Sequence, residues 1–259
     1  MSDRVMRDGE YGPPILDDDG LPITEIEVDD VDAAFGGDDA SLHQLASQQR
    51  AWRFGHVIVD EAQDLTPMQW RMIARRARGG SMTLVGDLAQ RSIGAPGAWR
   101  DHLPASIGSF SYQELSVNYR SPAEVGEIAA SALAELAPEL RPPVSIRHAV
   151  HPPRSRRLEV STQLGSLVQA LREEIDGGEI AVIGATDDEA VEIDGVRWLS
   201  PWQSKGLEFD AAVVVEPARM LDEANGLSLL FVALTRTTDL LVVAHERELP
   251  AWLARHFED

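Results

Sequence analysis

The feature that most constrains the fold is a repeated alternation of short apolar runs with stretches of helical spacing, starting near residue 54. The first run, His56–Asp60, is followed by Thr66 and Pro67, which suit the N-cap and the first position of a helix. Strands that are apolar throughout and separated by helices are typical of a parallel sheet covered on both faces. The sequence therefore predicts a doubly wound α/β fold with parallel sheets and helices on both faces.

The same patterns predict individual elements. Ser121 and Glu124 have the spacing of a capping box and begin a helix. The proline-rich residues 138–156 are predicted to form a long connection. The first helix has one apolar face that we expect to be buried, made of Met68, Met72, Ile73 and Ala77. Further strands are predicted at 81–85, 114–117, 158–160, 180–183, 196–199, 212–215 and 240–243, and further helices at 163–175 and 226–236.

Composition excludes several classes of protein. The 259 residues include no cysteine, so disulfides, thiolate metal sites and cysteine nucleophiles are excluded. No apolar run reaches the roughly 20 residues needed to cross a bilayer, and the first residues contain no apolar signal region. We therefore expect a cytoplasmic protein with no membrane partner. The formal net charge of −20 disfavours a general nucleic-acid surface but leaves a local cationic groove open.

The negative charge is concentrated at the start of the chain. Residues 1–50 contain 13 acidic and 3 basic side chains, a net charge of −10, together with several glycines and prolines. Such a composition predicts an acidic, partly disordered lead-in. Two interpretations of it stay open, a solvated tail and a docking surface for a basic partner.

Two adjacent carboxylates, Asp60 and Glu61, follow the first predicted strand directly. In open α/β sheets, ligands bind at the carboxyl ends of the strands. An aspartate there can hold Mg²⁺ through water, and a neighbouring glutamate can deprotonate a water that attacks a γ-phosphate. The alternative interpretation of these two residues alone is an ordinary acidic loop after a core strand.

Later segments favour the first interpretation. The second predicted strand ends in Gly86-Asp87-Leu88-Ala89-Gln90, and the segments Leu115–Ser121, Ser204–Asp210 and Leu230–Arg236 follow. Together with Asp60–Asp64, these resemble motifs II to VI of superfamily 1 helicases of the UvrD/Rep type, in the family order. The resemblance implies RecA-like P-loop NTPase type sheets: one complete RecA-like domain (2A) and the C-terminal part of another (1A).

The resemblance also implies roles for individual residues, with ATP as substrate and Mg²⁺ as cofactor. Asp60 resembles the Mg²⁺-associated acid, Glu61 the catalytic base and Gln90 the γ-phosphate sensor. Arg120 and Arg236 resemble arginines that contact the γ-phosphate. The residues expected to bind the rest of the nucleotide are Tyr119 (adenine), Glu208 (ribose), Lys205 and Gly206. Trp99 is either a packing residue or a platform for a nucleic-acid base.

No Walker A motif, G-x-x-x-x-G-K-[ST], occurs in this sequence, and Lys205 is its only lysine. We therefore expect the chain to correspond to the C-terminal half of such a motor and to need an N-terminal half that carries Walker A. The expected organisation is a lead-in at 1–50, part of domain 1A with motifs II and III at 51–108, and domain 2A with motifs IV to VI at 109–259. The chain alone is expected to hydrolyse no ATP.

The spacing of the motifs favours one subfamily. Only 84 residues separate Arg120 from Lys205, which leaves no room for the large 2B insertion of UvrD and Rep. This feature and the sequence around motif II resemble the HelD group, helicase-like ATPases that release or recycle bacterial RNA polymerase. RNA polymerase is therefore the expected partner, with nucleic acid a weaker one. The alternatives are a fragment of a UvrD/Rep-like DNA helicase and a degenerate RecA-like module that only binds protein.

Overall fold

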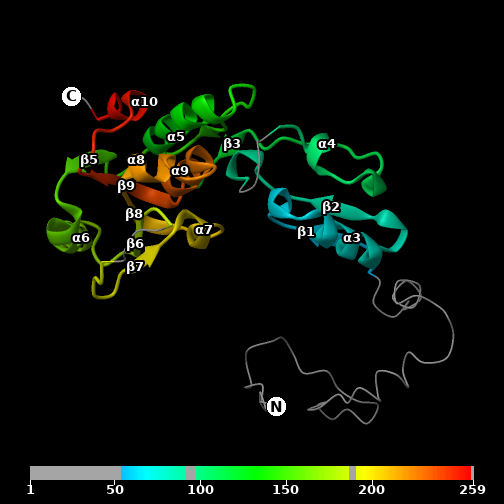
Figure 1. Ribbon diagram of the computed structural model, residues 1–259, viewed down its shortest axis with the longest axis horizontal. Helices are drawn as coiled ribbons and strands as arrows, with labels where there is room; N and C mark the ends of the chain where they lie inside the picture. Colours follow the sequence, from blue (N-terminus) through cyan, green and yellow to red (C-terminus); the bar gives the residue numbers. More distant parts are fainter. Residues whose placement is uncertain (1–53, 92–96, 187–190, 258–259) are drawn as a thin grey trace, which may run out of the picture. The chain divides into compact units, whose positions relative to one another are not determined.

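The computed structural model describes residues 54–91, 97–186 and 191–257 (Figure 1). The predicted lead-in at 1–50 lies outside these residues. The strands are β1 Val57–Val59, β2 Met82–Leu84, β3 Val117–Asn118, β4 Val144–Ser145, β5 Arg154–Arg157, β6 Ile180–Ile183, β7 Arg197–Leu199, β8 Phe209–Val215 and β9 Thr237–His245. The α-helices are α3 Pro67–Arg76, α4 Trp99–His102, α5 Ala123–Leu136, α6 Val160–Glu174, α7 Pro201–Ser204, α8 Pro217–Leu221, α9 Gly226–Leu234 and α10 Ala251–Ala254. The short 3-10 helices are η2 Ala62–Asp64, η3 Arg78–Gly80, η4 Leu88–Gln90 and η5 Ala105–Ile107.

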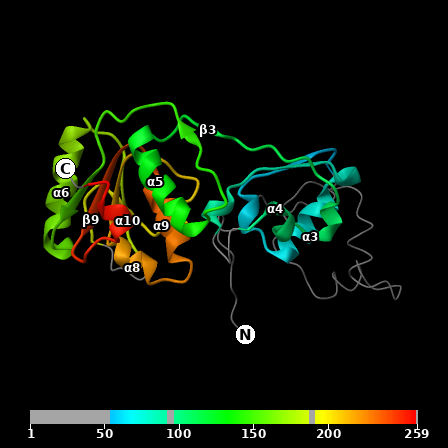
Figure 2. The same ribbon diagram turned by 90° about the horizontal axis from the view of Figure 1, so that it is seen from above.

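The main sheet has five parallel strands in the order β5-β9-β8-β6-β7. Its central strands are buried almost throughout, as their uninterrupted apolar sequence predicts. Residues of α5 and α9 pack in the hydrophobic cluster on one face, and residues of α6 pack in a second cluster on the other face. Figure 2 shows α6 on one side of β9 and α5 and α9 on the other. The predicted α/β class, with a parallel sheet covered on both faces, is confirmed.

A second sheet consists only of the parallel pair β1 and β2, with Ile58 opposite Thr83. One face packs against α3 through a small cluster that contains Val59, Ala62 and Trp70. On the other face, Ile58 is 73% exposed. The small region of residues 54–107 therefore has a much thinner core than the five-stranded region.

The predicted buried face of α3 is wrong in part. Met68 is 61% exposed and Met72 is 57% exposed, whereas Trp70 is only 2% exposed. The helix turns about 100° per residue, so a rotation that buries Trp70 moves both methionines away from the sheet. An indole buries more apolar surface than a methionine side chain, which accounts for this choice.

Two of the predicted strands and the predicted connection also need correction. Residues 158–160 are not a strand, because Val160 begins α6, and the strand is β5, whose arginines hide it from an apolar pattern. The strand predicted at 114–117 is only the two-residue β3, and its partner β4 lies inside the predicted connection at 138–156.

The capping box predicted for Ser121 does not form, since Pro122 is the N-cap of α5. Glu124 instead accepts hydrogen bonds from the Ala149 N–H (2.9 Å) and the His148 ring (2.9 Å). Thr66 does form the predicted cap of α3, with Gln69 completing the box.

Among the described residues, no helix combines the length and the apolar character that crossing a membrane requires.

Candidate functional site

The two candidate carboxylates lie exposed just beyond the carboxyl end of β1. The Asp60 Oδ1 atom accepts a hydrogen bond from the Glu61 N–H at 2.8 Å. Glu61 has a φ of 49°, in the left-handed region that non-glycine residues rarely occupy. Holding a glutamate there costs of order 1–2 kcal/mol, a cost that folds concentrate at functional sites.

Gln63 and Asp87 join the carboxyl ends of β1 and β2. The Gln63 Nε2 atom donates to the Glu61 Oε2 atom at 2.5 Å, and the Asp87 N–H donates to the Gln63 Oε1 atom at 3.1 Å. A Cβ atom at position 86 would lie 2.3 Å from the Gln63 Oε1 atom, and the glycine found there leaves this space to Gln63. The sequence analysis did not select Gln63 as a site residue. The signal available was a glutamine between acidic residues directly after an apolar strand.

Gln90 meets Arg236, as the motif resemblance leads one to expect. The Gln90 Nε2 atom donates to the Asp87 Oδ2 atom at 2.9 Å, and the Arg236 Nη2 atom donates to the Gln90 Oε1 atom at 3.2 Å. Arg236 is 3% exposed and is oriented further by its Nε donation to the Val232 carbonyl at 3.0 Å.

The electrostatics at Arg236 combine burial with mixed neighbouring charges. Burial lowers the pKa of the Arg236 guanidinium, and the positive charge of Arg120 lowers it further. The carboxylates of Glu61, Asp87 and Glu208 act in the opposite direction. Because an arginine side chain keeps its proton in proteins, the site contains a buried positive charge. A buried charge of this kind favours an anionic partner.

Arg120, Tyr119 and Glu208 lie together at the edge of this group. The Arg120 Nε atom and the Glu208 Oε2 atom are 2.6 Å apart, with about half of each side chain exposed. Tyr119 is 75% exposed, so its ring face is open for stacking. The Asn118 Oδ1 atom accepts the N–H groups of Arg120 (2.9 Å) and Ser121 (3.2 Å), which fixes the backbone after β3.

Lys205 is engaged by protein oxygens. Its Nζ atom donates to the Asp64 Oδ2 atom at 2.6 Å and to the Gln90 carbonyl at 2.5 Å. Gly206, the next residue, has a φ of 72° that favours glycine. These contacts place Lys205 beside η4 and leave its ammonium bonded to a carboxylate.

Trp99 begins α4 and packs against the small cluster that contains Val59 and Trp70. Its Cη2 atom would lie 2.9 Å from a Cβ atom at Gly86. This position favours the packing interpretation of Trp99. Its use as a base platform stays a prediction.

The two sheets contribute from opposite strand ends. Asp60 and Glu61 follow β1, and η4 follows β2, so these residues lie at carboxyl ends. Glu208 immediately precedes β8 and Arg236 immediately precedes β9, so these residues lie at amino ends. Tyr119 and Arg120 follow β3 and lie at a carboxyl end as well, so the rule that ligands bind at carboxyl ends describes only part of this site.

No group of three or more histidines and carboxylates suited to a metal ion occurs among the described residues. Asp60, exposed and with one oxygen turned to the Glu61 N–H, fits a Mg²⁺ ion held largely by water and phosphate oxygens. It does not fit an ion enclosed by protein ligands.

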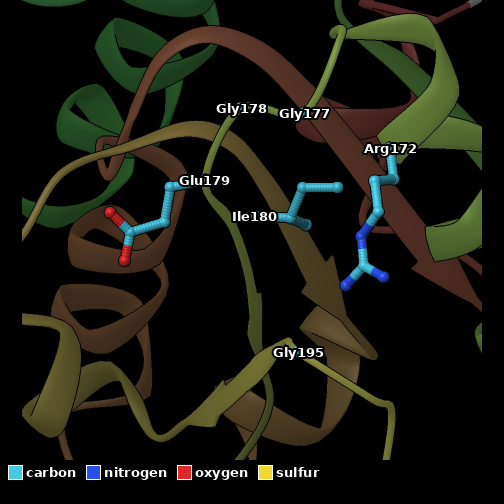
Figure 3. Close-up of a pocket in the computed structure, with 6 residues that line it drawn as sticks. All are labelled: Arg172, Gly177, Gly178, Glu179, Ile180 and Gly195. Atoms are coloured by element: carbon cyan, nitrogen blue, oxygen red, sulfur yellow. The ribbon is translucent and has the colours of Figure 1, made fainter.

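A cavity of about 430 Å³ lies elsewhere, at the amino end of β6, lined by Arg172, Gly177, Gly178, Glu179, Ile180 and Gly195 (Figure 3). The Arg172 side chain extends toward Gly195. The Gly177, Gly178 and Glu179 N–H groups all donate to protein oxygens already. These three N–H groups are therefore not free to cradle a phosphate.

Residues 34–93 match the sequence model of the UvrD/REP helicase N-terminal domain. The match covers less than half of the chain and agrees with the motif resemblance. No curated protein sequence matches the chain.

Several solved helicases are similar in structure. The PRRSV helicase has 18% identity and a TM-score of 0.46, and the match covers 74% of this chain and 35% of that one. An Arterivirus nonstructural protein 10 (helicase) in complex with DNA has 16% identity, a TM-score of 0.47, and coverage of 74% and 40%. The C-terminal domain of a possible DNA helicase from Lactobacillus plantarum WCFS1 has 17% identity, a TM-score of 0.38, and coverage of 53% and 93%. The chain thus spans about a third of the PRRSV helicase.

Proposed function

We propose that this chain is the C-terminal motor portion of a superfamily 1 helicase-like ATPase. The observation that carries the proposal is the contact between the Arg236 Nη2 atom and the Gln90 Oε1 atom, 3.2 Å apart. It joins the loop after β2 to the residue that precedes β9, which are far apart in the sequence. A buried guanidinium next to an amide, with exposed carboxylates nearby, is suited to binding a phosphate group.

Each candidate residue has a task that its surroundings allow. Glu61, exposed and held by Gln63, can accept a proton from an attacking water. Gln90 offers its amide, and Arg236 and Arg120 offer positive charge that stabilises charge developing on phosphate oxygens. Tyr119 presents an exposed ring that can stack on a base.

A bound Mg²⁺ ion would neutralise phosphate charge, with Asp60 holding it through water. Glu208 forms an ion pair with Arg120 in this structure. It could accept hydrogen bonds from the ribose hydroxyls only after this ion pair changes. Lys205 is likewise bonded to Asp64. The site as described is therefore one that nucleotide binding would rearrange.

The chain lacks the Walker A loop, so a second polypeptide segment must cradle the phosphates. We expect the 259-residue chain to show no ATP turnover that depends on Asp60. The measurement is the steady-state ATPase rate of the chain and of its Asp60→Ala variant. A rate that falls in the variant would contradict the need for a second segment.

In the complete motor, Arg236→Ala is expected to lower kcat by about 10³-fold or more, with a smaller effect on nucleotide affinity. Arg141→Ala, at an exposed position outside the site, is the matched control and is expected to leave kcat unchanged. An unchanged kcat in Arg236→Ala would remove this arginine from the reaction.

We propose further that the motor acts on bacterial RNA polymerase, as HelD-type proteins do. The support is the short spacing between Arg120 and Lys205 and the net charge of −20, which suits a partner with basic channels. The test is a binding assay of the complete protein with purified core RNA polymerase, and a parallel assay with single-stranded DNA at rising salt concentration. Polymerase binding supports the proposal. Salt-sensitive DNA binding without polymerase binding would replace it with a UvrD/Rep-like DNA helicase.

A further inference from the structure

A series of hydrogen bonds links Arg236 to Glu61 through the side chains of Gln90 and Gln63 and through Asp87, which accepts with its carboxylate and donates with its backbone N–H. Arg236 donates to Gln90 (3.2 Å), Gln90 donates to Asp87 (2.9 Å), the Asp87 N–H donates to Gln63 (3.1 Å), and Gln63 donates to Glu61 (2.5 Å). We infer that Gln63 and Asp87 are positioning residues that couple the orientation of Glu61 to the contact between Gln90 and Arg236. The inference rests on the proposed function, in which Glu61 is the base and Arg236 meets phosphate.

Every bond along the path is donated in the same direction, from the arginine toward the glutamate. The two charged ends fix the orientation of both amides. Gln90 must turn its oxygen to the Arg236 guanidinium and its NH₂ group to the Asp87 carboxylate. Gln63 must turn its NH₂ group to the Glu61 carboxylate and its oxygen to the Asp87 N–H. Reversing either amide would place two donors or two acceptors face to face.

Gln63 has little freedom to leave the path. It is 2% exposed, and a buried amide that loses its hydrogen-bond partners is destabilising. The missing side chain at Gly86 provides the space for its oxygen, since a Cβ atom there would lie 2.3 Å away. The amide is therefore held in one position between the ends of β1 and β2.

The Glu61 carboxylate is oriented by its contact with Gln63. Its side chain is exposed, and Gln63 is the group that donates to its carboxylate among the described residues. The hydrogen bonds position Gln90, Asp87 and Gln63 against one another, so a change at Arg236 that moves Gln90 or Asp87 also moves the donor that Glu61 receives. A phosphate that draws Arg236 away from Gln90 would thus change how the base is held.

The test uses the 259-residue chain, labelled with ¹⁵N and free of nucleotide, and follows the side-chain NH₂ signals of its glutamines by NMR. The perturbing variant is Glu61→Gln, which removes the charge at one end of the path. We expect the NH₂ signals of both Gln63 and Gln90 to shift. The internal controls are Gln69 and Gln203, whose side chains complete helix caps elsewhere and should not shift.

Two further variants interrupt the path at different bonds. Gln63→Met keeps the length of the side chain and removes both of its hydrogen bonds. Asp87→Ala keeps the backbone N–H and removes the carboxylate that accepts from Gln90, so it serves if Gln63→Met does not fold. In either background, Glu61→Gln is expected to leave the Gln90 signal unmoved.

A Gln90 signal that still shifts in both interrupted backgrounds would overturn the inference, as would a Gln90 signal that does not respond to Glu61→Gln in the unmodified chain. The outcome is independent of the proposed function, because no nucleotide is present. A path that passes this test in a protein that binds no nucleotide would leave the coupling intact and remove only the proposed ATPase role.

Discussion

The two-stranded region and the five-stranded region differ in the size of their cores and in where their candidate site residues lie. The five-stranded sheet is covered on both faces, and its candidate residues stand in loops at the amino ends of β8 and β9. The two-stranded sheet has one covered face, and its candidate residues follow the carboxyl ends of β1 and β2 directly.

This difference indicates that, at the candidate site, the position of the smaller region depends on contacts with the larger one. Side chains of the larger region contact the η4 segment. The Ser228 hydroxyl lies within hydrogen-bond distance of the carbonyl oxygens of Ala89 and Arg91, and the Lys205 ammonium donates to the carbonyl of Gln90. Ala89 is itself part of the larger hydrophobic cluster. The loop that carries Gln90 is thus held by the larger region, whereas Asp60 and Glu61 follow a strand with little core behind it.

The largest effect should separate the two cores. Leu164→Ala in α6 removes a side chain that is 0% exposed and should lower the free energy of unfolding by about 2–5 kcal/mol. Met72→Ala in α3 is the matched change on an exposed helix face and should cost about 0.5 kcal/mol or less. Both values come from denaturant titrations followed by circular dichroism. Similar losses for both variants would show that α3 has a second covered face.

A smaller effect should appear at the close contact behind Glu61. Gly86→Ala inserts a Cβ atom 2.3 Å from Gln63 Oε1 and should destabilise the chain by about 1–3 kcal/mol. Gly165→Ala in α6 meets no atom within 4 Å and should stabilise it by about 0.5–1 kcal/mol. Opposite signs in thermal unfolding are expected. A neutral Gly86→Ala would mean that Gln63 is free to move.

The helix caps give a third comparison. Thr66→Ala removes the N-cap of α3 in the small region and should cost about 1 kcal/mol. Ser121→Ala, at the position that only the sequence pattern identifies as a cap, should cost clearly less because its side chain caps nothing in α5. Equal losses in urea titrations would restore the sequence interpretation of Ser121.

The smallest effect concerns the larger region's pH dependence. The Ala149 N–H has the largest effect and lowers the pKa of Glu124, and the Glu124 N–H and the His148 ring lower it further, against a rise from partial burial. A native pKa below the unfolded one stabilises the fold above the unfolded pKa, and this stabilisation is lost as the pH falls through the native value. Glu124→Gln should therefore be slightly less stable than the parent at neutral pH, with the difference closing in acid. A stability difference between Glu124→Gln and the parent that stays constant from neutral to acidic pH would exclude this role of the Glu124 hydrogen bonds.

Much of the fold could be predicted from periodicity because the central strands are apolar on both faces. The predicted run at 180–183 coincides with β6, and the runs at 212–215 and 240–243 lie inside β8 and β9. Prediction fails where tertiary contacts decide. Arg154 lies in β5 because its charge is paired with Glu174, a partner that no local pattern identifies.

The candidate site was predictable only as far as motif resemblance reaches. The resemblance selects Gln90 and Arg236, and the structure brings them together. Gln63 and Asp87 escape such an analysis because the hydrogen bond that joins them spans 24 residues of sequence. The roles assigned to the site residues and the domain boundaries at 51–108 and 109–259 stay predictions.

The most direct measurement of the central claim is a titration of the ¹⁵N-labelled chain with Mg²⁺ and ATP, followed by NMR. The claim is that residues at the ends of β1 and β2 and residues before β8 and β9 form one site for nucleotide phosphate. We expect weak, Mg²⁺-dependent shifts centred on the Gln90 side chain, the Arg236 Nε–H group and the backbone of Glu61. Absence of any shift, or shifts centred on the cavity at Gly177–Ile180, would contradict the account.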